Sequence, residues 1–108
     1  MSWRARRDRH LRDPWPRQLG NLASTLARLA SRCADPRHDG LTRALLRETA
    51  LMLDWSAPEV EAALWPELAA AQREVVQWWR IWPVDPARGL LRLRARQLSD
   101  RILALSGL

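Results

Sequence analysis

The chain has 108 residues, of which 47% are hydrophobic and 28% charged, and its formal net charge is +6 at pH 7. A chain of this length folds as one domain with one core. It contains no apolar run near the ~18 residues that a membrane-spanning helix needs, so a membrane partner is not expected. The single cysteine, Cys33, and a charged N-terminus without the apolar centre of a secretory signal favour a cytoplasmic location.

All 18 basic residues are Arg, and they are distributed unevenly along the chain. The net charge is +4 over residues 1–17, +2 over 18–49, −4 over 50–87 and +4 over 88–108. A codon bias towards Arg in a GC-rich genome explains the missing Lys, because the bias runs through the whole chain; selection of guanidinium groups for phosphate or carboxylate recognition is the alternative. The acidic middle could pair with the basic ends inside the fold or across a dimer, which competes with a nucleic-acid interpretation.

Residues 1–13 are predicted to form a loosely ordered basic arm that contains Trp3. From residue 14 onwards the apolar residues have the spacing of an amphipathic helix. The intervals between the first apolar positions are 4, 3, 4, 3 and 4, which places them on one side of a helix that begins near Pro14 and Pro16. These positions are Trp15, Leu19, Leu22, Leu26, Leu29 and Cys33.

A second helix is expected after "CADPRHDG", where Asp35 can cap and Pro36 can occupy the first helical position. Its apolar residues wrap around much of the circumference, so we expect it to be the most buried helix. These residues are Leu41, Leu45, Leu46, Ala50, Leu51, Met52 and Leu53. The helix should end near Trp55, where Ser56 and Glu59 have the spacing of a capping box.

A third helix is expected from about Pro66 to Trp82, after a short helical turn, and a fourth begins at Asp85 and Pro86. The inward side of the third carries Leu68, Ala71, Val75, Trp78 and Trp82. That of the fourth carries Leu91, Ala95, Leu98, Ile102 and Leu105, with Gly107 placed as a C-terminal cap. The chain is therefore predicted to be all-α, with residues 14–108 forming a small bundle of about four mostly antiparallel helices.

The residue types argue against catalysis. Without Lys there is no Walker loop, Schiff base or lysine base, and neither glycine-rich nucleotide signature occurs. Cys33, His10 and His38 lack the spacing of a zinc site. A Cys33–His38 dyad is disfavoured because Cys33 falls on the apolar seam, where a free thiol behaves as a small hydrophobe. The prediction is a non-enzyme without cofactor, metal or small-molecule substrate.

The tryptophans direct attention to binding. The stretch "VVQWWRIWP" holds three of seven Trp residues in a chain without Phe or Tyr. Trp78 and Trp82 share a face of the predicted helix, whereas Trp79 points about 100° away from Trp78. Next to Arg80 it forms a Trp/Arg pair of the kind that is enriched in binding hot spots. We therefore predict a protein-docking face marked by Trp65, Trp79 and Arg80.

The predicted function is a non-enzymatic protein–protein interaction module, acting as a homo-oligomer or as a small subunit or adaptor. The alternative is a small nucleic-acid-binding or ribonucleoprotein subunit, in which the basic arm and the last helix contact phosphates. The candidate phosphate ligands are Arg4, Arg6, Arg7, Arg9, Arg88, Arg92 and Arg96. For the last three, a basic solvated helix face, paired with the acidic helix, is favoured over phosphate binding.

Overall fold

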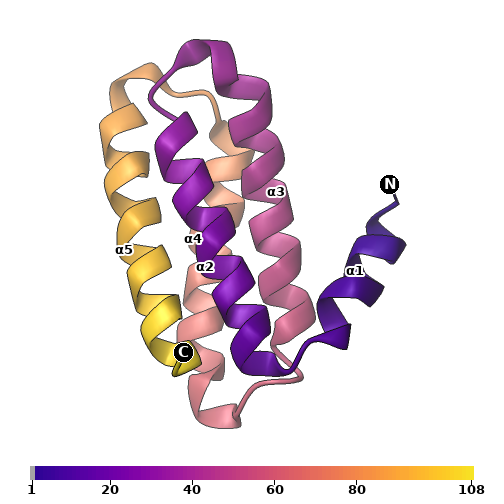
Figure 1. Cartoon of the computed structure of the whole chain (residues 1–108). Coiled ribbons are helices and arrows are strands. Elements are labelled where there is room, and N and C mark those ends of the chain that lie inside the picture. Colours follow the sequence, from indigo (N-terminus) through magenta and orange to yellow (C-terminus); the bar gives the residue numbers. More distant parts are fainter. Residues whose placement is uncertain (1) are drawn as a thin grey trace.

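The computed structural model describes residues 2–108 as an all-helical protein (Figure 1), which confirms the predicted fold class. Within this range the chain forms five α-helices, one more than expected. They are α1 (Trp3–Arg12), α2 (Trp15–Arg32), α3 (Asp39–Ser56), α4 (Trp65–Ile81) and α5 (Arg88–Ser106). Short 3-10 turns at Pro36–His38, Ala62–Leu64 and Asp85–Ala87 precede α3, α4 and α5.

Helices α2 to α5 form an antiparallel bundle, and α1 lies outside it against the end of α3 (Figure 1). Helix α2 packs along both α5 and α3, and α3 packs along α4. Helices α4 and α5 are also neighbours, but their backbones do not pack closely against each other as those of the other neighbouring pairs do. They are joined mainly by side chains.

The extra helix is α1, in the segment expected to be a loose arm. The Oγ of Ser2 caps it by accepting a hydrogen bond from the backbone N–H of Ala5 at 3.2 Å. The segment lacks an apolar stripe, but Arg is a good helix former and contacts with α3 hold the helix on the bundle. Those long-range contacts could not be read from local spacing.

The core follows the predicted spacing closely. Leu19, Leu22, Leu26, Leu29 and Cys33 of the first seam are all buried, and Trp15 packs at its edge. The expectation that the second helix would be the most buried is wrong. Helix α2 buries eight residues and α3 buries seven, and the outer side of α3 leaves Leu41 41% exposed.

Two of the predicted helix signals are confirmed. The carboxylate of Asp35 accepts from the backbone N–H of Arg37 at 2.9 Å, with Pro36 first in the turn. Gly107 ends α5 in the left-handed conformation, with φ of 72°, which L side chains rarely adopt.

Two other signals are wrong. Ser56 does not begin a capping box but is the last residue of α3, and its Oγ lies 2.6 Å from His10 Nε2. Asp85 lies inside its 3-10 turn rather than capping it, and accepts a hydrogen bond from Arg88 at 2.9 Å.

Candidate functional site

Three tryptophans and several arginines come together where α1, α3 and α4 meet. The guanidinium of Arg47 on α3 lies 5.8 Å from the ring centroid of Trp3 and 5.4 Å from that of Trp79. Arg43 lies 4.6 Å from the Trp79 centroid on α4, and Arg6 lies 4.9 Å from the Trp3 centroid. Arg47 therefore links an indole of α1 to an indole of α4 across the outer side of α3.

Two hollows open on this surface, and they share Arg47 and Leu51. The larger, about 480 Å³, lies between α1 and α3, and the smaller, about 190 Å³, lies between α3 and α4. We call this surface the Trp/Arg face. It consists of Trp3, Arg4, Arg7, Arg43, Arg47, Ala50, Leu51, Asp54, Trp55, Gln72, Val76 and Trp79.

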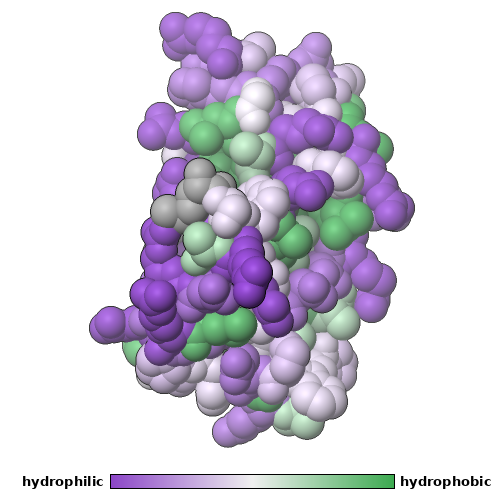
Figure 2. Space-filling model, turned by 90° about the vertical axis from the view of Figure 1, so that its right-hand side faces the viewer, coloured by the Kyte–Doolittle hydropathy of each residue, from purple (hydrophilic) through white to green (hydrophobic). Residues whose placement is uncertain are grey.

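Helical spacing explains why these residues share a surface. Arg43, Arg47 and Leu51 follow one another every four residues on the outer side of α3. The side of the molecule that carries α1 is mostly hydrophilic, with separate hydrophobic patches between the polar groups (Figure 2). Apolar rings and cationic groups are thus interleaved.

The structure does not gather the predicted docking residues into one cluster. Trp65 and Trp79 lie fourteen residues apart near opposite ends of α4, which is about 21 Å along a helix. Trp65 is 50% exposed, whereas Trp79 is half-buried under Arg43 and Arg47. Arg80 is exposed, and the arginines that cover Trp79 come from α3 instead.

Sequence reasoning missed Arg43 and Arg47 as members of the site. Their four-residue spacing, continued by Leu51 on the same side of the helix, is the one signal that could have indicated it. Which ring they cover depends on how α3 packs against α1 and α4.

The candidate phosphate ligands separate into two groups on different sides of the bundle. Arg4, Arg6, Arg7 and Arg9 lie on α1, at the opposite edge of the view from α5 (Figure 1). On α5, Arg92 and Arg96 are exposed, but the Arg88 side chain is only 12% exposed. The two groups therefore do not form one continuous phosphate track.

Arg88 is a structural residue in this fold. Its guanidinium donates to Asp39 Oδ1 at 2.7 Å, to Asp85 Oδ1 at 2.7 Å and to the carbonyl oxygen of Cys33 at 3.1 Å. It also lies 5.2 Å from the ring centroid of Trp82. The hydrogen bonds from Arg88 lower the pKa of Asp39.

His10 attaches α1 to the end of α3. Its imidazole is buried, lies 2.6 Å from Ser56 Oγ and stacks in a tilted arrangement on Trp55, with 5.9 Å between the ring centroids. Burial lowers the pKa of His10, and nearby Asp13 acts in the opposite direction. The neutral imidazole is thus the form that fits the docked helix.

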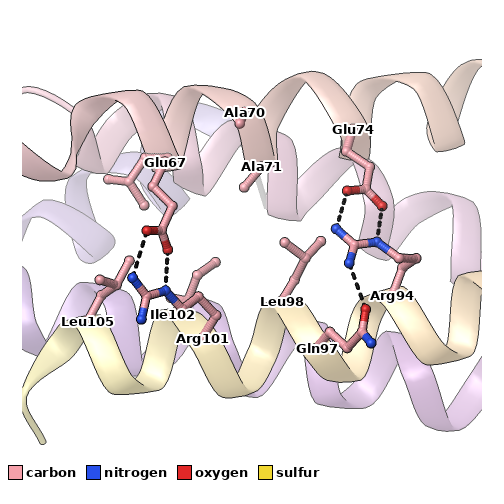
Figure 3. A pocket seen from close by; sticks show the side chains of 11 residues that line it. Glu67, Ala70, Ala71, Glu74, Arg94, Gln97, Leu98, Arg101, Ile102 and Leu105 are labelled. Atoms are coloured by element: carbon pink, nitrogen blue, oxygen red, sulfur yellow. Dashed lines mark hydrogen bonds and ion pairs between the residues drawn. The ribbon is translucent and has the colours of Figure 1, made fainter.

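A second surface lies between α4 and α5, where a groove of about 360 Å³ separates the two helices (Figure 3). Bidentate ion pairs span it: Arg94 donates to Glu74 at 2.6 and 2.9 Å, and Arg101 donates to Glu67 at 2.6 and 2.9 Å. These hydrogen bonds lower the pKa of both glutamates. The acidic middle therefore pairs with the basic last helix inside the fold, which was one of the two arrangements expected.

The groove floor between the ion pairs is apolar. Leu98 of α5 and Ala70 and Ala71 of α4 lie between the two pairs, and Leu105 lies beyond Arg101 (Figure 3). Leu98 and Leu105, expected to be inward-facing, are only partly buried because α4 and α5 stand apart.

Residues 2–108 contain no cluster of three His, Cys, Asp or Glu side chains that could hold a metal ion, and no helix long and apolar enough to cross a membrane. Cys33 is fully buried, and its burial raises the pKa of the thiol, which disfavours the reactive thiolate.

Comparison of the chain with protein-family models, with curated proteins and with solved structures gives no match.

Proposed function

We propose that the protein is a non-enzymatic protein–protein interaction module whose binding surface is the Trp/Arg face. The observation that carries this proposal is the position of Arg47 between the indoles of Trp3 and Trp79, where it lines two hollows. Trp and Arg are among the residues most enriched in protein-binding hot spots, where they supply large contact areas and directional hydrogen bonds.

The chemistry of the face defines the kind of partner. Arg4, Arg7, Arg43 and Arg47 supply positive charge, and Asp54 is the one acidic residue that lines the two hollows. Leu51, Val76 and the indoles supply apolar area between these charges. The complementary partner is a protein segment with an apolar stripe flanked by carboxylates, because carboxylates match guanidinium groups in charge and geometry.

A second candidate function is nucleic-acid binding through α1. The observation in its favour is the density of charge on that helix, which has five Arg and one Asp among its ten residues. Against it, Trp3 and Trp79 already have guanidinium groups of the chain itself near their rings, so a base would have to displace them before stacking.

Affinity capture with two charge-matched variants tests the proposal. The wild type, Arg47→Glu and Arg96→Glu would each be immobilised and exposed to a nuclease-treated extract of the source cells. Arg96 is exposed on α5 away from the Trp/Arg face, so both variants change the net charge equally. We expect one protein to be retained by the wild type and by Arg96→Glu but lost with Arg47→Glu. Equal retention by all three proteins would contradict the proposal.

A fluorescent single-stranded oligonucleotide separates the second candidate. The protein-binding proposal predicts that Arg47→Glu and Arg96→Glu weaken any oligonucleotide binding by a similar small factor, since both act only through net charge. Nucleic-acid binding would be favoured instead if substitutions of Arg47 and of the α1 arginines weakened oligonucleotide binding while Arg96→Glu did not, and if the binding depended steeply on salt.

A further inference from the structure

In the single chain, the groove between α4 and α5 leaves an apolar surface exposed to solvent. Its floor is apolar, and three large side chains near it remain half-exposed: Ile81 at 54%, Leu90 at 52% and Leu93 at 53%. Helical register places them on the sides of α4 and α5 that line the groove. Ile81 follows Glu74 by seven residues on α4, Leu90 precedes Arg94 by four on α5, and Leu93 precedes Gln97 by four.

The acidic and basic residues that line this groove lie on different helices. The α4 edge carries Glu67 and Glu74, and the α5 edge carries Arg94 and Arg101. The pairs Glu67–Arg101 and Glu74–Arg94 show that the helices run antiparallel and that both edges have charges at the same two levels (Figure 3). One edge is therefore acidic and the other basic over two helical turns.

This arrangement is complementary to itself. Suppose a second copy faces the groove with the twofold axis parallel to the helices. The partner's α4 then lies over α5, and each Glu of one copy stands at the level of an Arg of the other. With the axis perpendicular to the helices, α4 would face the partner's α4 and like charges would meet, which is unfavourable.

We propose that the α4/α5 groove is the interface of a homodimer with its twofold axis along the groove. Burial of Leu90, Leu93, Ile81 and the groove floor supplies the affinity. The charges set the orientation, because partly exposed ion pairs contribute little energy but like charges in contact are costly. The carboxylates and guanidiniums can share hydrogen bonds with both copies. This surface is separate from the Trp/Arg face, so a failure of one proposal leaves the other untouched.

Two complementary variants test the interface. Glu67→Arg with Glu74→Arg makes the groove edges wholly basic, and Arg94→Glu with Arg101→Glu makes them wholly acidic. The mass of the wild type, of each variant and of their equimolar mixture would be measured by analytical ultracentrifugation over a concentration series. Circular dichroism would establish that each variant is folded.

We expect the wild type to reach twice the 12.5 kDa mass of the chain. Each variant alone should remain monomeric, and the mixture should recover the dimer. The control, Arg92→Glu with Arg96→Glu, changes exposed charges on another side of α5 and should dimerise like the wild type. A monomeric wild type, or variants that dimerise alone as well as in the mixture, would overturn the proposal.

A pair of single substitutions covers the case in which the charge variants do not fold. Leu93→Glu and Leu103→Glu each place a carboxylate at a half-exposed position of α5, with Leu93 on the groove side and Leu103 on another side. Leu93→Glu should raise the dimer dissociation constant at least tenfold, and Leu103→Glu should leave it unchanged. An equal effect of the two substitutions would overturn the proposal.

Discussion

Arg47 of α3 and Trp79 of α4 form a cation–π contact at 5.4 Å, and the same guanidinium extends the contact to Trp3 of α1. One side chain thereby links three helices on the outer surface of the bundle. The other attachments of α1 to α3 include the buried His10–Ser56 hydrogen bond, the Trp3–Trp55 ring contact and the Arg6–Glu48 ion pair. A small number of contacts therefore holds α1 in place on the bundle. Because α1 forms one side of the Trp/Arg face, the same contacts determine the shape of that face.

Replacing Arg47 by Ala should loosen α1 and destabilise the protein slightly. Exposed cation–π contacts contribute about 0.5–1 kcal/mol each, so we expect a loss of about 1 kcal/mol in the free energy of unfolding. Urea denaturation measures the loss, and hydrogen exchange should show faster exchange of α1 amides. Arg73→Ala, on the exposed side of α4, is the control. Equal exchange of α1 amides in the two variants would contradict the linking role of Arg47.

Acidification should destabilise the docked α1. Burial lowers the pKa of His10 below the value of about 6.5 that it has when unfolded. Between the folded and unfolded pKa values the unfolded chain binds more protons, so the free energy of unfolding falls as the pH drops through this range. Thermal unfolding from pH 7.5 downwards checks this. His10→Gln should be less stable at pH 7.5 and less sensitive to pH near 6; a variant with the same pH slope as the wild type would exclude His10 as the cause.

Gly20→Ala should stabilise the protein despite a close contact. Gly20 lies inside α2, where Gly costs about 1 kcal/mol relative to Ala. A Cβ there would come within 2.8 Å of Leu108 Cδ1, the far end of the side chain of an exposed terminal residue that can move away. We expect a gain of up to about 1 kcal/mol, measured by chemical denaturation. A loss of stability would show that the Leu108 side chain is held more firmly than its exposure indicates.

Arg88→Lys should lower the melting temperature, whereas Arg96→Lys should not. Arg88 binds two carboxylates and a backbone carbonyl at once, which the single ammonium group of Lys cannot reproduce. Arg96 is exposed on the same helix. Differential scanning fluorimetry compares the two variants. Equal melting temperatures would mean that the Arg88 contacts do not persist in solution.

The all-α class and the core seams could be predicted from apolar spacing, because that pattern reports directly on which helix face is buried. Positions such as Leu22, Leu68 and Leu91 follow it. The cap at Asp35 and the termination of α5 at Gly107 could also be predicted from the sequence, since each depends only on adjacent residues.

The candidate site was less accessible to sequence reasoning. Trp79 was identified as unusual, but its actual neighbours Arg43 and Arg47 lie more than thirty residues earlier, on another helix. Ser56 had the spacing of a capping box, yet a long-range contact with His10 takes its hydroxyl. Polar contacts between helices depend on packing, which local periodicity does not encode.

We propose that this protein works by protein–protein association and not by binding phosphate. Size-exclusion chromatography with light scattering, recorded at 260 and 280 nm, tests it most directly. Salt at about 0.1 M and then about 1 M reduces the Debye length from about 10 Å to about 3 Å, which weakens exposed charge contacts. We predict an oligomer that is free of nucleic acid and keeps its mass in both salts. A particle that carries 260 nm-absorbing material in low salt and sheds it in high salt would contradict the claim.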